Sequence, residues 1–334
     1  EEHGEHEYQF GICEAERAEK GKRMIAFSHK PVMLEECMAG LKLKDGGVYF
    51  DGTIGGGGHS YEILKRTAPG GRLIATDLDD CAIEAASKRL AEFAGRFRIY
   101  KSNYKDFAAV LEEDGTDKLD GVLLDFGVSS FQLDEVSRGF SYMKDAPLDM
   151  RMNPQAAFSA EDVVNTYSQE KLAKIIDAYG EEKFAKKIAA NIVRAREKGR
   201  ITRTGELKRI IEASIPAKFQ HNGPCERKTF QAIRIEVNDE LGGLEDAVRG
   251  LARRLKKGGR ICILTFHSLE DRIVKNVFRD MATDCICDKS LPVCVCGKKK
   301  EIEIITRKPL TATEEELADN SRSKCAKLRI AEKV

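Results

Sequence analysis

The nine residues from Asp51 to His59, DGTIGGGGH, constrain the fold of this chain more than any other segment. They follow the β-branched and aromatic run Val48–Phe50, and an amphipathic segment begins at Tyr61. Strand, glycine turn and helix in this order are typical of a nucleotide-like cofactor site, because glycines let backbone N–H groups approach a ligand closely. A glycine-rich surface loop without a ligand is the alternative. Asp77 and Asp79, at the end of the next strand-like run, argue against it, because an acid there can accept hydrogen bonds from a ribose diol.

The spacing of the glycines separates two classes of cofactor. A dinucleotide site needs the pattern G-x-G-x-x-G. Counted from Gly55, the third glycine would fall on Ser60; counted from Gly56, it would fall on Tyr61. The pattern is therefore absent, and the turn opens with an acid, Asp51. A carboxylate there repels a pyrophosphate but can face the cationic end of S-adenosylmethionine, which we expect as the cofactor.

The order of the predicted elements indicates an α/β fold. Strand-like runs alternate with amphipathic segments, which implies right-handed βαβ units and a parallel sheet. From about 138 to 231 only helical periodicity is present, as at Phe184, Ile188 and Ile192. We therefore expect one sheet interrupted by a helical insertion. The predicted strands are 48–51, 72–77, 97–101, 121–125, 260–265, 301–306 and 326–331, with a helix at about 232–256 that Lys257-Gly258-Gly259 ends.

The composition favours a cytoplasmic protein. No apolar run of about 18 residues predicts a transmembrane helix, and the acidic N-terminus lacks the apolar core of a secretory signal. Most cysteines, such as Cys37, Cys81 and Cys262, stand alone in apolar stretches, which fits a reducing compartment better than a disulfide framework. We expect residues 1–23 to be an acidic, poorly ordered extension, with Met24 as a plausible natural start.

The insertion carries a one-sided charge. Between Lys183 and Lys228 the sequence has thirteen Lys and Arg against four Glu and no Asp, a formal excess of nine positive charges. A solvated helix face is the commoner reason for a charge run. An excess this one-sided favours contact with phosphates, so we expect RNA or DNA as a partner and binding that weakens with salt.

The run Leu123-Leu124-Asp125-Phe126-Gly127-Val128-Ser129 places a carboxylate at the carboxyl end of a buried strand, where ligands of open α/β sheets bind. An exocyclic amine on a base is a poor nucleophile, because its lone pair is delocalised into the ring. An acceptor for its N–H can localise that pair while orientation supplies much of the acceleration. Asp125 and Ser129 are the candidate catalytic acceptors; either is equally a candidate cofactor ligand or turn residue.

Four cysteines are clustered near the C-terminus, as Cys285-x-Cys287-x₆-Cys294-x-Cys296. Two close pairs joined by a short loop can converge on one tetrahedral zinc ion. The C-x-C spacing is less diagnostic than C-x₂-C, and reduced free thiols are the alternative. Such a zinc would be structural rather than catalytic.

Several long motifs, in order from about 27 to 332, resemble the RsmH (MraW) family. They are His29–Glu35 (HKPVMLE), Asp51–His59, Asp125–Asp134, Arg138–Ser141 (RGFS), Pro147–Met152 (PLDMRM), Thr229–Ile235 (TFQAIRI), Phe266–Arg272 (FHSLEDR) and Ala326–Arg329 (AKLR). The resemblance implies a class I, Rossmann-like methyltransferase sheet with an inserted helical domain. It also implies S-adenosylmethionine-dependent methylation of N4 of a decoding-site cytidine in bacterial 16S ribosomal RNA. A non-catalytic ribosome assembly factor, or an aminomethyltransferase acting on DNA or a small molecule, is the alternative.

By the same resemblance, the methyltransferase domain covers 24–137 and 233–334, and the substrate-recognition insertion covers 138–232. The partner is the small ribosomal subunit RNA, with no membrane, and a homodimer is left open. The expected cofactor-binding residues are Asp51, Gly57, Gly58, His59, Asp79, Tyr104, Asp125 and Gln132.

Three other features leave alternatives open. His59 is expected to cap its helix or to contact the methionine carboxylate of the cofactor. His267 is either near the target base or a hydrogen-bonded residue at a strand end, before a helix that begins at Ser268. Asp149 and Arg151 form an internal ion pair or face RNA.

Overall fold

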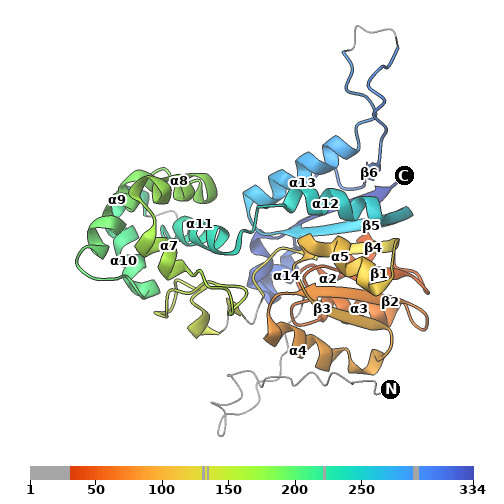
Figure 1. Ribbon diagram of the computed structural model, residues 1–334, viewed down its shortest axis with the longest axis horizontal. Helices are drawn as coiled ribbons and strands as arrows, with labels where there is room; N and C mark the ends of the chain where they lie inside the picture. Colours follow the sequence, from red (N-terminus) through yellow and green to blue (C-terminus); the bar gives the residue numbers. More distant parts are fainter. Residues whose placement is uncertain (1–30, 130–131, 134, 221–222, 289–292) are drawn as a thin grey trace, which may run out of the picture.

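The computed structural model describes residues 31–334, apart from 130, 131, 134, 221, 222 and 289–292 (Figure 1). The predicted acidic extension at 1–23 and the predicted start at Met24 lie outside the described residues.

A seven-stranded sheet forms the centre of the larger lobe (Figure 1). Its order is β3-β2-β1-β4-β5-β7-β6; the first five strands along this order are parallel, and β7 runs antiparallel to β5 and β6. The predicted Rossmann-like sheet of the class I methyltransferase type is therefore confirmed. The strands are β1 (Val48–Asp51), β2 (Arg72–Asp77), β3 (Phe97–Lys101), β4 (Leu119–Asp125), β5 (Leu255–Thr265), β6 (Ile302–Ile304) and β7 (Lys327–Lys333).

Helices cover both faces of the sheet, because neighbouring residues of a strand point to opposite faces and both are apolar. Phe50 packs with α5, α12 and α13, whereas Tyr49 packs on the other side with α2 and α3. Both aromatic side chains are almost fully buried. The covering helices are α2 (Leu34–Leu41), α3 (Gly58–Arg66), α4 (Asp80–Arg89), α5 (Phe107–Asp114), α12 (Leu244–Arg254) and α13 (Ser268–Met281), with the short α14 (Glu314–Asp319) near the C-terminus.

The helical segment between β4 and β5 forms a second lobe beside the sheet (Figure 1). It has its own apolar core, to which α9 contributes Ile188 and Ile192 and α10 contributes Leu207 and Ile211. These pairs are four residues apart, so each lies on one face of its helix. The helices are α7 (Ala160–Thr166), α8 (Gln169–Gly180), α9 (Ala185–Arg196), α10 (Thr204–Ser214) and α11 (Arg227–Asn238).

The single helix predicted at about 232–256 is wrong. Helix α11 ends at Asn238 and α12 begins at Leu244, because the chain between them adopts left-handed conformations, with φ of 46° at Asp239 and 69° at Gly243. Lys257-Gly258-Gly259 is also not a stop between elements. These residues lie inside β5, where Gly258 has φ +77° and the pairing register with β4 shifts.

The structure tests two of the expectations drawn from composition, on membrane helices and on cysteines. None of the described helices is long and apolar enough to cross a membrane. Cys37 and Cys262 are buried free thiols, as expected.

Candidate active site

The glycine turn after β1 is held between the two neighbouring strands. The Gly52 N–H donates to the Leu123 carbonyl of β4 (3.0 Å), and the Ile54 N–H donates to the Thr76 carbonyl of β2 (3.0 Å). Gly57 caps α3 with φ +73°, and a Cβ there would lie 3.2 Å from the Cα of Ala86. Glycine is therefore required at Gly57 by both its backbone angle and its neighbour.

Asp77, at the end of β2, organises the turn. Its Oδ2 accepts a hydrogen bond from the Gly55 N–H (2.9 Å), and its Oδ1 accepts from the N–H groups of Leu78 (2.8 Å) and Asp79 (3.0 Å). Burial raises the pKa of the Asp77 carboxyl group. Oδ2 keeps a lone pair for a further donor, and the side chain lines a cavity, as a ribose-binding acid should.

Asp79, two residues further on, does not line the cavity. It is 1% exposed, caps α4 through the Cys81 N–H, and accepts hydrogen bonds from Gln132 Nε2 (3.2 Å) and Arg138 Nη1 (2.9 Å). Its carboxylate therefore ties the sheet to the segment after β4. A direct contact between Asp79 and the cofactor stays a prediction.

Asp51 and His59 are two buried side chains at the ends of the glycine turn. The Ser60 hydroxyl donates to Asp51 Oδ2 (2.6 Å), and the Thr53 N–H donates to Oδ1 (3.1 Å). Burial raises the pKa of Asp51 and lowers the pKa of His59. His59 Nε2 lies 3.0 Å from the Val32 carbonyl and must donate to it, so Nδ1 is the acceptor nitrogen. The prediction that His59 caps the helix is wrong, because Gly57 holds that position and His59 is in the first turn.

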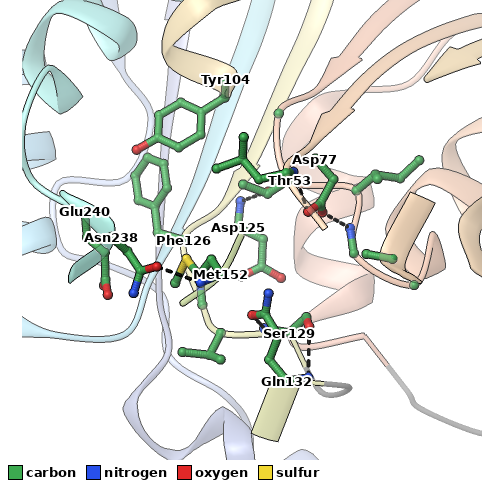
Figure 2. A pocket seen from close by; sticks show the side chains of 18 of the residues that line it. Thr53, Asp77, Tyr104, Asp125, Phe126, Ser129, Gln132, Met152, Asn238 and Glu240 are labelled. Atoms are coloured by element: carbon green, nitrogen blue, oxygen red, sulfur yellow. Dashed lines mark hydrogen bonds between the residues drawn. The ribbon is translucent and has the colours of Figure 1, made fainter. Parts of the chain in front are cut away.

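Asp125 ends β4 at the centre of the site (Figure 2). Its N–H donates to Thr53 Oγ1 (2.7 Å). Among the described residues, its carboxylate accepts one hydrogen bond, a long one from the Gly127 N–H (3.4 Å), and Oδ2 lies 3.9 Å from His59 Nδ1. Burial raises the pKa of Asp125 to about 6. The carboxylate therefore keeps free acceptor positions that face the cavity.

Ser129 is more fully engaged than Asp125. Its N–H donates to Gln132 Oε1 (3.1 Å), and its Oγ accepts from the Gln132 N–H (3.2 Å). This reciprocal pair shapes the turn after β4 and directs Gln132 toward Asp79. Ser129 lines the cavity, but its hydrogen bonds are those of a turn residue.

A cavity of about 600 Å³ joins these groups at the carboxyl edge of the parallel strands. Figure 2 shows Asp125 between Thr53 and Asp77 of the sheet and Met152, Asn238 and Glu240 from the segments beyond it. The helical insertion thus supplies one wall. Of the predicted cofactor-binding residues, Gly58, His59, Tyr104, Asp125 and Gln132 line the cavity, whereas Asp51, Gly57 and Asp79 support those that do.

Aromatic rings form part of the wall near Asp125. The rings of Tyr104 and Phe126 lie 5.3 Å apart, tilted by 39°. Burial raises the pKa of Tyr104 well above its ordinary value, so its hydroxyl stays neutral. A flat, uncharged surface of this kind suits a purine or pyrimidine ring.

A buried charge cluster, which the sequence did not reveal, borders the same cavity. Glu240 pairs with Arg234 through two 2.8 Å hydrogen bonds. His267 Nε2 lies 3.1 Å from Glu270 Oε1 and 3.8 Å from Glu240 Oε2. Burial alone would lower the pKa of His267, but its interactions with the carboxylates of Glu240 and Glu270 raise it to about 9. The imidazolium therefore neutralises two acids at the cavity wall.

His267 also caps α13. Its Nδ1 lies 3.4 Å from the Glu270 N, and Glu270 Oε2 accepts from the His267 N–H (3.3 Å). The interpretation as a hydrogen-bonded histidine at a strand end is confirmed. Glu240 was missed because it was placed inside a continuous helix; the Gly242-Gly243 pair was the available signal for a break.

The Asp149–Arg151 pair is internal. Arg151 Nε and Nη2 donate to the two carboxylate oxygens of Asp149 at 2.8 and 2.6 Å, and Nη1 donates to the Ala156 carbonyl. The ion-pair alternative is therefore confirmed.

Part of the positive charge of the insertion is compensated internally. Arg203 pairs with Asp145 at 2.6 Å and Lys208 with Glu226 at 3.1 Å. In contrast, Lys183, Lys186 and Lys187 are exposed along a groove between α8 and α9. No ion pair links these three lysines to an acid within the described part of the chain. They remain available for phosphates.

The sequence is similar to known proteins over most of its length. Residues 26–334 match the model of the MraW methylase family. The chain is 52% identical to ribosomal RNA small subunit methyltransferase H of Clostridioides difficile (strain 630), over 93% of this chain and 100% of the relative. It is 54% identical to ribosomal RNA small subunit methyltransferase H 2 of Agathobacter rectalis, over 92% and 99%. Among solved structures, a putative rRNA-methylase from Clostridium thermocellum is 12% identical, with a TM-score of 0.42 over 92% of this chain and 100% of that one.

Proposed function

This chain belongs to the MraW methylase family, and on that premise we propose that it transfers a methyl group from S-adenosylmethionine to N4 of a decoding-site cytidine in bacterial 16S ribosomal RNA. Relatives at 52–54% identity, matched over almost their whole length, are named ribosomal RNA small subunit methyltransferase H. The observation that carries the proposal is the single cavity that joins the glycine turn to Asp125 and to the helical insertion.

The residues of the cavity fit S-adenosylmethionine. The turn offers a glycine, Gly56, where a Cβ would have open space around it, so a ligand can approach the backbone. Asp77 keeps acceptor capacity for the ribose, and Tyr104 offers a flat apolar surface for the base. When bound, the cofactor supplies an electrophilic methyl group next to a cluster of carboxylates, Asp51 and Asp125, which suits its positive charge.

Besides Gly56 and Asp77, we assign direct cofactor contacts to Gly58, His59, Tyr104, Asp125 and Gln132, with Asp51, Gly57 and Asp79 holding them in place. A structural zinc, the second cofactor expected from the sequence, would lie outside this cavity at the four cysteines.

Asp125 is the residue we assign to the amine. Its carboxylate has free acceptor positions in a buried site, so it can accept an N–H of the exocyclic amine and direct the nitrogen lone pair. Methylation would form the N–CH₃ bond as the S–CH₃ bond of the cofactor breaks, with the electron pair of that bond kept by the sulfur of S-adenosylhomocysteine. The amine would release one proton, which a carboxylate with a pKa of about 6 can take up and pass to solvent. Ser129 is the weaker assignment, because its N–H and Oγ already bond Gln132.

We assign RNA recognition to residues 138–232, with residues 24–137 and 233–334 as the methyltransferase domain. Enzymes that modify a base remove it from the stack, and RNA loops present splayed bases. The lysines on α9 would then contact flanking phosphates. A protein that acts on the small ribosomal subunit works in the cytoplasm; sedimentation velocity would test the homodimer that the sequence leaves open.

A methyl-transfer assay with tritiated cofactor tests the proposal. Small ribosomal subunits, duplex DNA and small amines are compared as substrates, and nucleoside mass spectrometry identifies the product. We expect incorporation into subunit RNA as N4-methylcytidine. Incorporation into DNA or small amines would overturn the substrate assignment, and no incorporation despite cofactor binding would favour a non-catalytic assembly factor.

Two variants of β4 separate the role of Asp125 from a general effect on the strand. Asp125→Asn should reduce incorporation strongly. Asp120→Asn, at the opposite end of the same strand, should retain it, because Asp120 bonds Lys256 and the Val48 N–H away from the cavity. Equal activity of the two variants would contradict the assignment of Asp125.

A further inference from the structure

An excursion of the chain between α13 and β6 carries four cysteines. It projects away from the sheet, beyond α13 and β6 (Figure 1). None of the four cysteines lines the cavity of the active site. Cys285 and Cys287 lie on one arm of the excursion, and Cys294 and Cys296 lie on the other.

The four sulfur atoms converge on one point. All four Sγ atoms lie within 4.8 Å of one another. The Sγ–Sγ distances are 3.5 Å for Cys285–Cys294, 3.8 Å for Cys287–Cys294, 3.5 Å for Cys294–Cys296 and 3.9 Å for Cys285–Cys296. A tetrahedron of sulfur atoms around zinc, with Zn–S bonds of about 2.3 Å, has edges of about 3.8 Å. The observed distances are close to that value.

We propose that Cys285, Cys287, Cys294 and Cys296 bind one Zn²⁺ ion as four thiolate ligands. A disulfide would require sulfur atoms about 2.05 Å apart, and all four cysteines are free. Four sulfur ligands in tetrahedral arrangement select zinc or iron. With all four positions filled by protein, the site has no open position for substrate, so the ion is structural.

Backbone hydrogen bonds support the thiolates independently of the sulfur distances. The Ile286 N–H donates to Cys296 Sγ (3.5 Å), the Cys287 N–H to Cys285 Sγ (3.4 Å) and the Val295 N–H to Cys287 Sγ (3.3 Å). These donors come from both arms. They stabilise negative charge on the sulfur atoms, as the outer contacts of metal sites do.

The described residues of the excursion form no apolar core that could hold its arms together. Ile286, Val293 and Val295 are 67%, 70% and 76% exposed. Hydrophobic burial therefore contributes little here, and short segments without a core usually depend on a disulfide or a metal. The zinc ion would provide that cross-link between α13 and β6.

Metal analysis of the full-length protein tests the site. Protein expressed with zinc and purified without chelator should contain about one zinc per chain by mass spectrometry of the metals. The double variant Cys285→Ser/Cys294→Ser should contain almost none. Cys325→Ser is the matched control, because Cys325 is an exposed free thiol outside the cluster, and it should keep the metal.

A second measurement does not depend on how the variants fold. Replacement of zinc by Co²⁺ in the wild-type protein should give thiolate-to-cobalt charge-transfer bands and the visible bands of a tetrahedral site. Zinc-free protein with all thiols reduced and no cobalt spectrum would overturn the proposal, and so would stoichiometric iron. Methyl transfer is not the readout, so this test is independent of the proposed function.

Discussion

Asp125→Asn should make the protein more stable while it lowers methyl transfer. Burial raises the pKa of Asp125 from 3.8 to about 6, so the folded state disfavours the ionised form. A shift of about 2 pKa units corresponds to roughly 3 kcal/mol of lost stability once the group is ionised in both states. Asparagine keeps the size of the side chain and one acceptor oxygen but carries no charge, so the variant should recover up to about 3 kcal/mol at pH 8.

The gain should depend on pH with a defined sign. Below pH 3.8 the carboxyl is protonated in both states and costs nothing. As the pH rises from 3.8 to about 6, the unfolded chain ionises first and the folded state loses stability. The cost is roughly 1.6 kcal/mol at pH 5 and roughly 3 kcal/mol at pH 8. The advantage of Asp125→Asn should therefore grow by about 1.4 kcal/mol between these two pH values.

Urea unfolding followed by circular dichroism, at pH 5 and pH 8, measures the effect. Asp120→Asn is the control with the opposite sign: burial raises the pKa of Asp120, but hydrogen bonds from Lys256 and Lys44 bring it below its ordinary value. Its loss should destabilise the protein at pH 8. A variant Asp125→Asn that is no more stable than wild type at pH 8, or whose gain is equal at both pH values, would refute the burial argument.

Three further results are expected. Gly57→Ala should cost at least roughly 1–2 kcal/mol of stability, because Gly57 has φ +73° and a neighbour, Ala86, close to the added Cβ, and calorimetry should show weaker binding of S-adenosylmethionine. Gly115→Ala, with the same φ but open space around it, should cost less stability and leave cofactor affinity intact. The wild-type protein should lose stability as the pH rises through about 9, because the charged imidazole of His267 stabilises the fold only below its pKa. His267→Gln should remove this loss, as measured by urea midpoints across that pH range. Lys186→Gln/Lys187→Gln should lower the salt dependence of subunit-RNA affinity by about 0.7–0.9 in slope per lost phosphate contact, while Lys257→Gln, on β5, should not.

The sheet and the glycine turn could be predicted from the sequence because their signals are local. Val48–Asp51 is a short apolar strand followed at once by glycines, and each later strand is bounded by turn residues. The break between α11 and α12 was missed because apolar residues keep a helical spacing on both sides of Asp239–Gly243. Only the backbone angles there end the helix.

The site could be predicted only as far as its residues carry local patterns. Asp125 and Asp77 follow strands, so their place at the sheet edge is implied by the fold. The contact of His267 with Glu240 is different, because 26 residues separate them along the chain. They meet only because the loop after α11 lies against the start of α13. The role of Asp79 likewise depends on Arg138, which approaches from the segment after β4.

The helical insertion leaves the sheet after β4, and the chain returns to the sheet through α12 and β5. Strands β4 and β5 are paired neighbours. Its entry and exit are therefore anchored in adjacent hydrogen-bonded strands. A bundle attached in this way can be exchanged for another without any change in strand register. On the proposed role of the insertion in RNA recognition, such an exchange would alter which substrate is bound while the strands that carry Asp77 and Asp125 are kept.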